Sequence, residues 1–170
     1  RSHRLSQERA LPGGSRHPLR SPVIRAPAAS EQDMGTGKVL SAVSDGIMTV
    51  TLQRPEKLNA IDNDLARELL HAIAIAGNNE DVRVLLLRGA GRAFCAGRDV
   101  GAPPTRQDLE LVQAVAEALV SLPKPVVAAV HGWTLGAGLE WMLDADVAIA
   151  AESSRFKYPR RPWASSSPVD

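Results

Sequence analysis

Two glycine-rich turns, about forty residues apart, constrain this chain more than any other feature. The turns cover residues 94–99 and 131–140, and each follows a short apolar run that predicts a buried strand. A strand followed by glycines and a helix start presents free backbone N–H groups to an oxyanion. Two such turns can give one donor each to a single carbonyl oxygen, and Glu140 lies in the helix that the second turn opens. The sequence therefore predicts a site that polarises a carbonyl group beside a carboxylate acid/base.

Strand and helix patterns alternate along residues 38–159. The predicted strands are residues 39–43, 47–52, 82–87, 126–130 and 147–150. The predicted helices run from the N-cap Asp62 to about residue 76, from the Thr105 and Asp108 capping box to the proline at 123, and over 137–143. We expect Gly77 to end the first helix. Asp45-Gly46 predicts a hairpin turn between the first two strands. This order indicates an α/β fold with a largely parallel sheet and crossover connections.

Both ends of the chain lack periodicity. Residues 1–37 are rich in Arg, Pro and Ser, and this composition predicts a disordered arm. We interpret Met34 as lying near the start of the native protein and the arm as a tag or spurious extension, with an organelle transit peptide as the alternative. Residues 160–170 are predicted to be an unstructured tail. Residues 38–159 therefore form the one organised domain.

Composition excludes several classes of function. The formal net charge of +1 gives no field for binding nucleic acid or an anionic membrane, and no apolar run is long enough to span a bilayer. Cys95 is the single cysteine, so the sequence predicts no disulfide, no metal site and a cytoplasmic location. The Gly-X-Gly pairs lack the third glycine of a dinucleotide fingerprint, which argues against a nicotinamide or flavin cofactor.

Glu140 is the strongest catalytic candidate. It stands among apolar and small residues, so we expect an isolated and partly desolvated acid suited to proton transfer. The alternative is a helix-start glutamate favoured by the helix dipole. Cys95 is interpreted as a packed residue rather than a nucleophile, and His131 as structural. We expect Trp133 and Trp141 to lie in the core or in a pocket wall.

Several ordered motifs together resemble one family. They cover residues 52–60, 92–100, 124–132 and 135–140, and continue through 144–146 to Phe156. In this set the chain is similar to the enoyl-CoA hydratase/isomerase superfamily, over about residues 38–159. The resemblance implies a crotonase-like (ClpP/crotonase) superhelix of ββα units, here incomplete, and an acyl-CoA thioester as substrate. Coenzyme A would enter as part of that substrate, with no tightly bound cofactor.

The resemblance also implies roles for individual residues. The backbone N–H groups of Arg98 and Ala137 would form an oxyanion hole for the thioester carbonyl. Glu140 matches one of two glutamates that activate and deliver water in the hydratases. The residues implied in substrate and CoA binding are Lys57, Leu58, Asn59, Ala60, Ala96, Gly97, Asp99, Gly136 and Gly138.

The chain departs from the family pattern at one end. The second hydratase glutamate would directly follow Pro159, where this sequence has Arg160, a fixed cation. The segments that form homo-trimers or hexamers in the family would lie beyond this point, and the change of character is what a truncation or frame shift would produce. Two hypotheses stay open. The chain is either a lyase or isomerase acting on enoyl-CoA, or a catalytically incomplete fragment or CoA-binding scaffold.

Overall fold

The computed structural model describes residues 37–101 and 103–158. Its strands are β1 (Val39–Ser44), β2 (Ile47–Leu52), β3 (Val84–Gly89), β4 (Ala93–Cys95), β5 (Val126–Val130), β6 (Trp133–Leu135), β7 (Val147–Ala150) and β8 (Arg155–Lys157). Its helices are the short 3-10 turn η1 (Pro55–Lys57), α1 (Asn63–Asn78), α2 (Arg106–Ser121) and α3 (Ala137–Leu143). The predictions for residues 1–36 and 159–170 fall outside the described residues.

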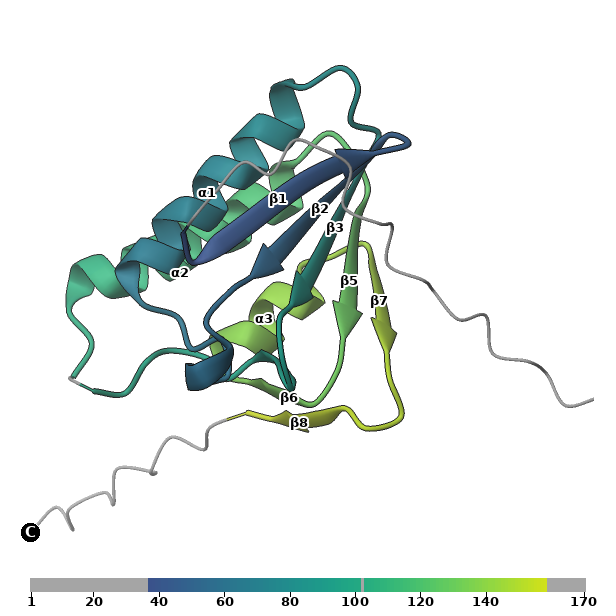
Figure 1. Ribbon diagram of the computed structural model, residues 1–170. Coiled ribbons are helices and arrows are strands. Elements are labelled where there is room, and N and C mark those ends of the chain that lie inside the picture. The colour runs from purple at the N-terminus through teal and green to yellow at the C-terminus, as the bar shows by residue number, and fades with distance from the viewer. Residues whose placement is uncertain (1–36, 102, 159–170) are drawn as a thin grey trace, which may run out of the picture.

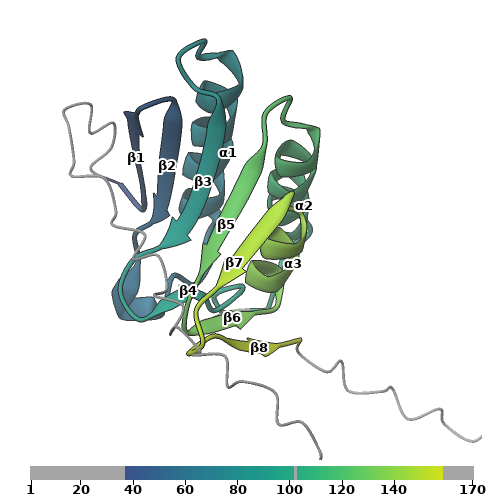
Figure 2. The same ribbon diagram turned by 90° about the vertical axis from the view of Figure 1, so that its right-hand side faces the viewer.

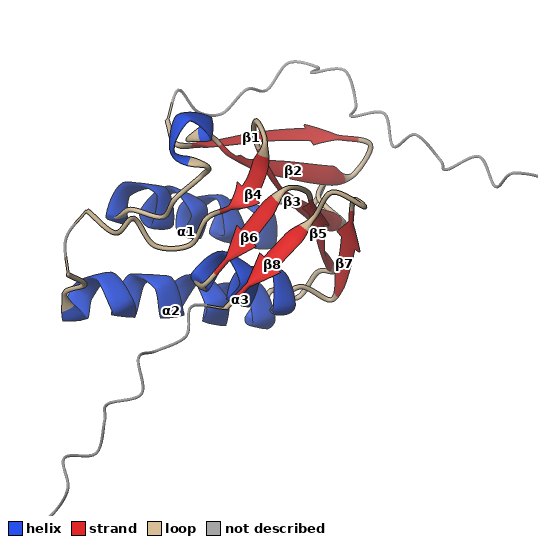
Figure 3. Ribbon diagram, turned by 90° about the horizontal axis from the view of Figure 1, so that it is seen from below, coloured by secondary structure: helices blue, strands red, loops and turns tan. Residues whose placement is uncertain are grey.

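Two sheets and one layer of helices make up the fold. The larger sheet has the order β1-β2-β3-β5-β7, and only β1 runs antiparallel to its neighbour. The three helices lie behind this sheet in Figure 2, and α1 packs on both β1 and β2. The smaller parallel sheet, β4-β6-β8, crosses the end toward which β2, β3, β5 and β7 point (Figures 1 and 3). The predicted α/β fold with a largely parallel sheet is confirmed.

The first hairpin forms as predicted, whereas the next strand is displaced along the chain. Asp45 and Gly46, both with positive φ, turn β1 into β2. The strand expected over 82–87 instead covers Val84–Gly89. Val82 is buried, but its N–H donates to the Asn79 carbonyl at 3.1 Å in the turn that follows α1. Burial of an apolar residue therefore does not mark the start of a strand.

Helix α1 begins as predicted and ends later. The Asp62 carboxylate accepts a hydrogen bond from the Leu65 N–H at 2.9 Å, which confirms the N-cap. The prediction that Gly77 ends the helix is wrong, because α1 continues to Asn78. A Cβ at position 77 would lie 3.3 Å from the Leu122 side chain. That contact is with the end of a flexible side chain, so neither the helix nor its packing on the α2 segment requires a glycine at this position.

Helix α2 begins at the predicted capping box. The Thr105 hydroxyl accepts from the Asp108 N–H, and the Asp108 carboxylate accepts from the Thr105 N–H at 2.8 Å. The two ends of α2 differ in burial. Val115 and Leu119 are buried against the core, whereas Leu109 is 54% exposed. The first turns of α2 therefore extend beyond the core, toward the loop that follows β4.

The core lies between the helices and the larger sheet. The largest fully buried side chains include Trp141, Phe94, Met48, Leu52, Leu65, Leu69, Leu85 and Leu87. The expectation for Trp133 is wrong: this ring lies at the surface, with the Arg155 guanidinium 5.3 Å from its centre. Trp141 is in the core as expected. Within the described residues, no helix has the length and apolar character needed to cross a membrane.

Candidate active site

The two glycine-rich turns lie side by side at the junction of the sheets. Gly97 has a φ of +80°, and a Cβ built there would lie 2.7 Å from the Leu135 carbonyl oxygen and 3.6 Å from the Ala137 nitrogen. Gly136 adopts φ 50° and ψ −124°, a conformation that glycine alone tolerates. The absence of side chains at both positions therefore allows the turns to make contact.

The backbone around Arg98 alternates in direction. The Ile61 N–H donates to the Gly97 carbonyl at 2.8 Å, and the Asp99 N–H donates to the Ile61 carbonyl at 2.9 Å. The Arg98 N–H between them points away from this bridge. Among the described residues, no hydrogen bond uses the N–H of Arg98 or of Ala137. Both groups are therefore available to an acceptor outside the backbone.

A cavity of about 940 Å³ opens over these turns. Its wall comes from the two turns, the first half of α2, α3 and the end of β8: Ala96, Gly97, Arg98, Val100, Leu109, Val112, Leu135, Gly136, Ala137, Glu140, Lys157 and Tyr158. Most of these side chains are apolar. The structure thus brings six of the predicted residues to one wall, namely Ala96, Gly97, Arg98, Gly136, Ala137 and Glu140.

Glu140 is half-buried in this wall and is not the isolated acid that the sequence suggested. The Tyr158 hydroxyl donates a hydrogen bond to its Oε1 at 2.5 Å. This bond, together with the negative charge of Glu140, raises the pKa of Tyr158. One turn along α3, burial and then the charge of Glu140 raise the pKa of Asp144. Tyr158 was not among the predicted site residues, and its one sequence signal is an aromatic ring beside the proline of the last motif.

The loop predicted to bind CoA supports the site from behind. Asn59 is fully buried, and its amide donates to the carbonyls of Ala90, Ala93 and Phe94 at 2.8–3.2 Å. Its Oδ1 accepts from the Arg54 N–H at 2.9 Å. The Asn59 side chain therefore holds three segments together and is not free to contact a ligand, which corrects that expectation.

The other predicted binding residues also differ in position. Of the described residues in this loop, Lys57, Leu58 and Ala60 do not line the large cavity, although Lys57 is exposed. The Ala96 N–H donates to the Leu58 carbonyl at 2.9 Å, which fixes the loop against the first turn. A Cβ at Gly138 would lie 2.6–2.7 Å from Cys95, so this glycine permits close packing instead of ligand approach.

Arg54 is a second residue that sequence reasoning missed. Its side chain is only 13% exposed and donates to the Ala60 carbonyl at 2.6 Å. It also forms ion pairs with Asp62 and Asp99, each at 3.2 Å. One guanidinium therefore joins the loop, the start of α1 and the first glycine turn, which suits the rigid, forked geometry of arginine. The only sequence signal for Arg54 was its place in residues 52–60, one of the motifs that carry the family resemblance.

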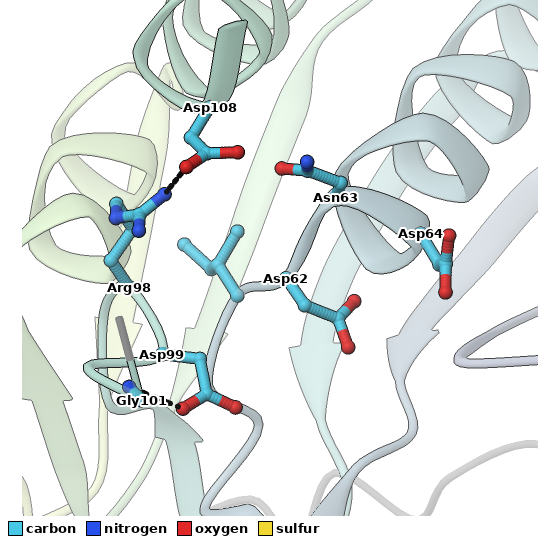
Figure 4. A pocket seen from close by; sticks show the side chains of 8 residues that line it. Asp62, Asn63, Asp64, Arg98, Asp99, Gly101 and Asp108 are labelled. Atoms are coloured by element: carbon cyan, nitrogen blue, oxygen red, sulfur yellow. Dashed lines mark hydrogen bonds and ion pairs between the residues drawn. The ribbon is translucent and has the colours of Figure 1, made fainter. Parts of the chain in front are cut away.

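A smaller pocket of about 400 Å³ lies on the other side of Arg98 (Figure 4). Asp99 lines this pocket and not the larger one. The Arg98 side chain points toward Asp108 and pairs with it at 3.2 Å. The pKa of Asp108 is lowered to about 2, chiefly by the Thr105 N–H, then by the Asn63 side chain and Arg98. No group of side chains suited to a metal occurs within residues 37–101 and 103–158.

The structure confirms the structural roles predicted for Cys95 and His131. Cys95 is fully buried, and burial raises the pKa of its thiol to about 12, so it is not a thiolate nucleophile at neutral pH. The His131 ring lies 2.9 Å from the Gly91 carbonyl oxygen through Nε2 and joins two loops.

Comparison with known proteins gives a consistent result. The family profile described as enoyl-CoA hydratase/isomerase matches residues 42–161. A 1,2-epoxyphenylacetyl-CoA isomerase of Escherichia coli is 38% identical over 69% of this chain and 49% of its own length. A short-chain-enoyl-CoA hydratase of Clostridium acetobutylicum is 35% identical over 66% of this chain and 46% of its own.

Solved structures agree with these relatives. An enoyl-CoA hydratase of Bacillus anthracis superimposes with a TM-score of 0.69 at 30% identity, over 72% of this chain and 50% of that one. The predicted crotonase-like fold is therefore confirmed. The chain spans about half the length of the curated relatives that it matches.

Proposed function

Because this chain belongs to the enoyl-CoA hydratase/isomerase family, we propose that it binds an enoyl-CoA thioester in the large cavity and catalyses hydration or isomerisation there. The observation that carries the proposal is the meeting of two glycine-rich turns beside Glu140. Each turn has one backbone N–H that no described residue occupies. We propose an acyl-CoA thioester as the substrate, a cytoplasmic location and no tightly bound cofactor.

The two amides would polarise the thioester carbonyl. The Arg98 and Ala137 N–H groups are held by backbone packing, so they need no rearrangement when negative charge develops on the oxygen. Preorganised donors of this kind each contribute about 10²–10³-fold to rate. The contact between Gly97 and the second turn supports this arrangement, because a side chain at position 97 would push the turns apart.

Glu140 would exchange the proton. Its carboxylate shares the cavity wall with apolar side chains such as Val112 and Leu135, and a carboxylate within reach of the substrate can act as a general acid/base. One carboxylate can remove a proton from one carbon and return it to another, which is the requirement of a double-bond isomerisation. Lys57, exposed on the supporting loop, is proposed to meet the phosphates of CoA.

Binding of acyl-CoA without turnover is the second candidate. Glu140 is the only carboxylate among the described residues of the cavity wall, whereas hydration by the family mechanism implies two. A single acid could leave a site that binds the thioester and does not hydrate it. This observation favours a binding scaffold over a hydratase, and it leaves isomerisation open.

Paired assays on the full chain separate the candidates. Loss of conjugated absorbance from a short 2-enoyl-CoA reports hydration, and its gain from a 3-enoyl-CoA reports isomerisation. We expect Glu140→Gln to lower either rate about 10²–10⁴-fold, with Glu80→Gln in an exposed loop as the matched control. Calorimetric binding of the thioester without turnover would establish the scaffold. A chain that shows no binding and no turnover of the thioester would refute the proposal.

A further inference from the structure

The pair formed by Tyr158 and Glu140 is the feature of the cavity that the family resemblance does not account for. Both side chains line the cavity, and they come from different elements, α3 and the end of β8. Tyr158 is 58% exposed, so burial does not force the phenol against the carboxylate. Within the described part of the chain, the 2.5 Å hydrogen bond is the only hydrogen bond or ion pair that either side chain makes.

Backbone contacts set the distance between the two residues. The Gly136 N–H, at the turn into α3, donates to the Lys157 carbonyl at 3.2 Å. Strand β8 also pairs with β6 through Leu135 and Lys157, directly before that turn. The residue after Lys157 is therefore fixed relative to the helix that carries Glu140. The phenol meets the carboxylate because both elements are anchored at Gly136.

A hydroxyl bonded to one carboxylate oxygen restricts the rotation of that group. The terminal torsion of glutamate is otherwise broad and nearly two-fold, so an unbonded carboxylate presents its oxygens in many orientations. With Oε1 bonded to the phenol, Oε2 remains to exchange a proton with a ligand. Holding a base in a reactive orientation is a recognised source of rate enhancement.

We propose that Tyr158 is a positioning residue for Glu140, holding Oε1 through its hydroxyl so that Oε2 meets the substrate in a defined orientation. The inference rests on the proposed function, because it presumes that Glu140 exchanges the proton. Tyr158 is the only tyrosine of the chain. Its ionisation can therefore be measured without interference from other phenols, and this gives a test that does not depend on activity.

The first test is an ultraviolet titration of the full chain, following tyrosinate absorbance. The pKa of Tyr158 is raised in the structure, so the wild-type phenol should ionise above the ordinary value of about 10. In Glu140→Gln the negative charge is gone while Arg98, Lys157 and Asp144 remain, and the midpoint should fall toward that value. Glu80→Gln should leave the midpoint unchanged. A wild-type midpoint at the ordinary value, or no change in Glu140→Gln, would overturn the pairing.

The second test is kinetic and uses Tyr158→Phe, which keeps the ring and removes the hydroxyl. We expect kcat to fall about 10- to 100-fold with KM unchanged, the range for a hydrogen bond to a charged group. In the Glu140→Gln background the same substitution should have no further effect, because Tyr158 acts through Glu140. Equal losses in both backgrounds, or a rise in KM alone, would contradict a positioning role.

The two tests separate failure of this inference from failure of the proposed function. A chain that binds no acyl-CoA and turns none over loses the proposed function, and with it the positioning role, even when the titration confirms the bond. An active chain in which Tyr158→Phe keeps full kcat retains the proposed function and refutes the inference. Circular dichroism of each variant shows that the fold is intact.

Discussion

Strands β3 and β7 have similar sequences and different surroundings. Both contain a short apolar run, both belong to the larger sheet, and each is followed by an alanine. Leu85 and Leu87 in β3 are fully buried, in a strand flanked by β2 and β5. Val147 and Ile149 in β7 are 51% and 47% exposed, and among the described strands β7 pairs only with β5. Burial is thus set by position in the sheet and not by the run itself.

The contrast extends to the whole C-terminal part of the described chain. Leu143, Phe156 and Tyr158 are also exposed, whereas most apolar residues before α3 are packed in the core. An apolar strand with one free edge is a surface on which another strand can add. The buried core is therefore built mainly by the elements before α3, whereas β7 and β8 contribute little to it, and the end of β8 borders the cavity.

The largest expected difference compares one apolar residue from each strand. Leu85→Ala should lower the free energy of unfolding by about 2–5 kcal/mol, since it leaves a cavity in the core. Ile149→Ala, at the exposed edge, should cost less than about 1 kcal/mol. Urea unfolding followed by circular dichroism measures both. Equal costs would mean that β7 is covered in solution.

A smaller loss of stability is expected from Asn59, which joins the supporting loop to the segment between β3 and β4 and to β4 itself. Asn59→Ala removes an amide bonded to three carbonyls and leaves buried groups unsatisfied, so it should cost about 1–3 kcal/mol. The control is Asn78→Ala, at the exposed end of α1, whose amide donates to one carbonyl among the described residues, that of Ala74. Thermal unfolding of the two variants should differ clearly. A neutral Asn59→Ala would contradict the structural role given to this side chain.

Two helical glycines allow a matched test of the close approach of α3 to β4. Gly138→Ala would place a Cβ 2.7 Å from the Cys95 carbonyl oxygen, a backbone atom, and should destabilise the fold by about 1–3 kcal/mol. Gly77→Ala meets only a flexible leucine methyl at 3.3 Å and should be neutral or stabilising by up to about 1 kcal/mol. Chemical denaturation of both variants checks the signs, and a stable Gly138→Ala would show that α3 can shift away from β4.

The smallest expected effect concerns pH. The pKa of Asp108 is lowered to about 2, below its ordinary value of 3.8, so its ionised form favours the folded state. The resulting stability is present above about pH 4 and is lost as the pH falls toward 2. Asp108→Asn should remove part of this acid sensitivity, which the melting temperature between pH 5 and 2 measures. An unchanged acid slope would indicate that other carboxylates dominate.

The local elements and the family could be predicted from the sequence because their signals are local. Asp62 and the Thr105–Asp108 capping box mark helix starts through contacts over three residues, and the Asp45-Gly46 hairpin is equally local. The predicted residues 96–98 and 136–140 meet because each follows a strand of the same sheet system. Their roles in chemistry stay predictions.

Residues whose role depends on distant partners could not be found in this way. Asn59 and Arg54 have no unusual local pattern. Their roles depend on partners that include the Ala93 carbonyl and the Asp99 carboxylate, each more than thirty residues away along the chain. Asp99 turned toward the smaller pocket because Arg54 holds it there. The exposure of Trp133 and the burial of Trp141 likewise follow from which sheet and helix face each one occupies.

Local patterns along the chain were sufficient for the five strands of the larger sheet, the three helices and the kinship with one enzyme family, since each of these depends on neighbouring residues. The short strands β4, β6 and β8 of the smaller sheet were not predicted. Three features emerged only from the folded arrangement: the phenol against Glu140, the support that Asn59 gives to the loop, and the edge position of β7 among the described strands. Those facts depend on contacts between segments that are remote in sequence, and periodicity contains no information about such distances.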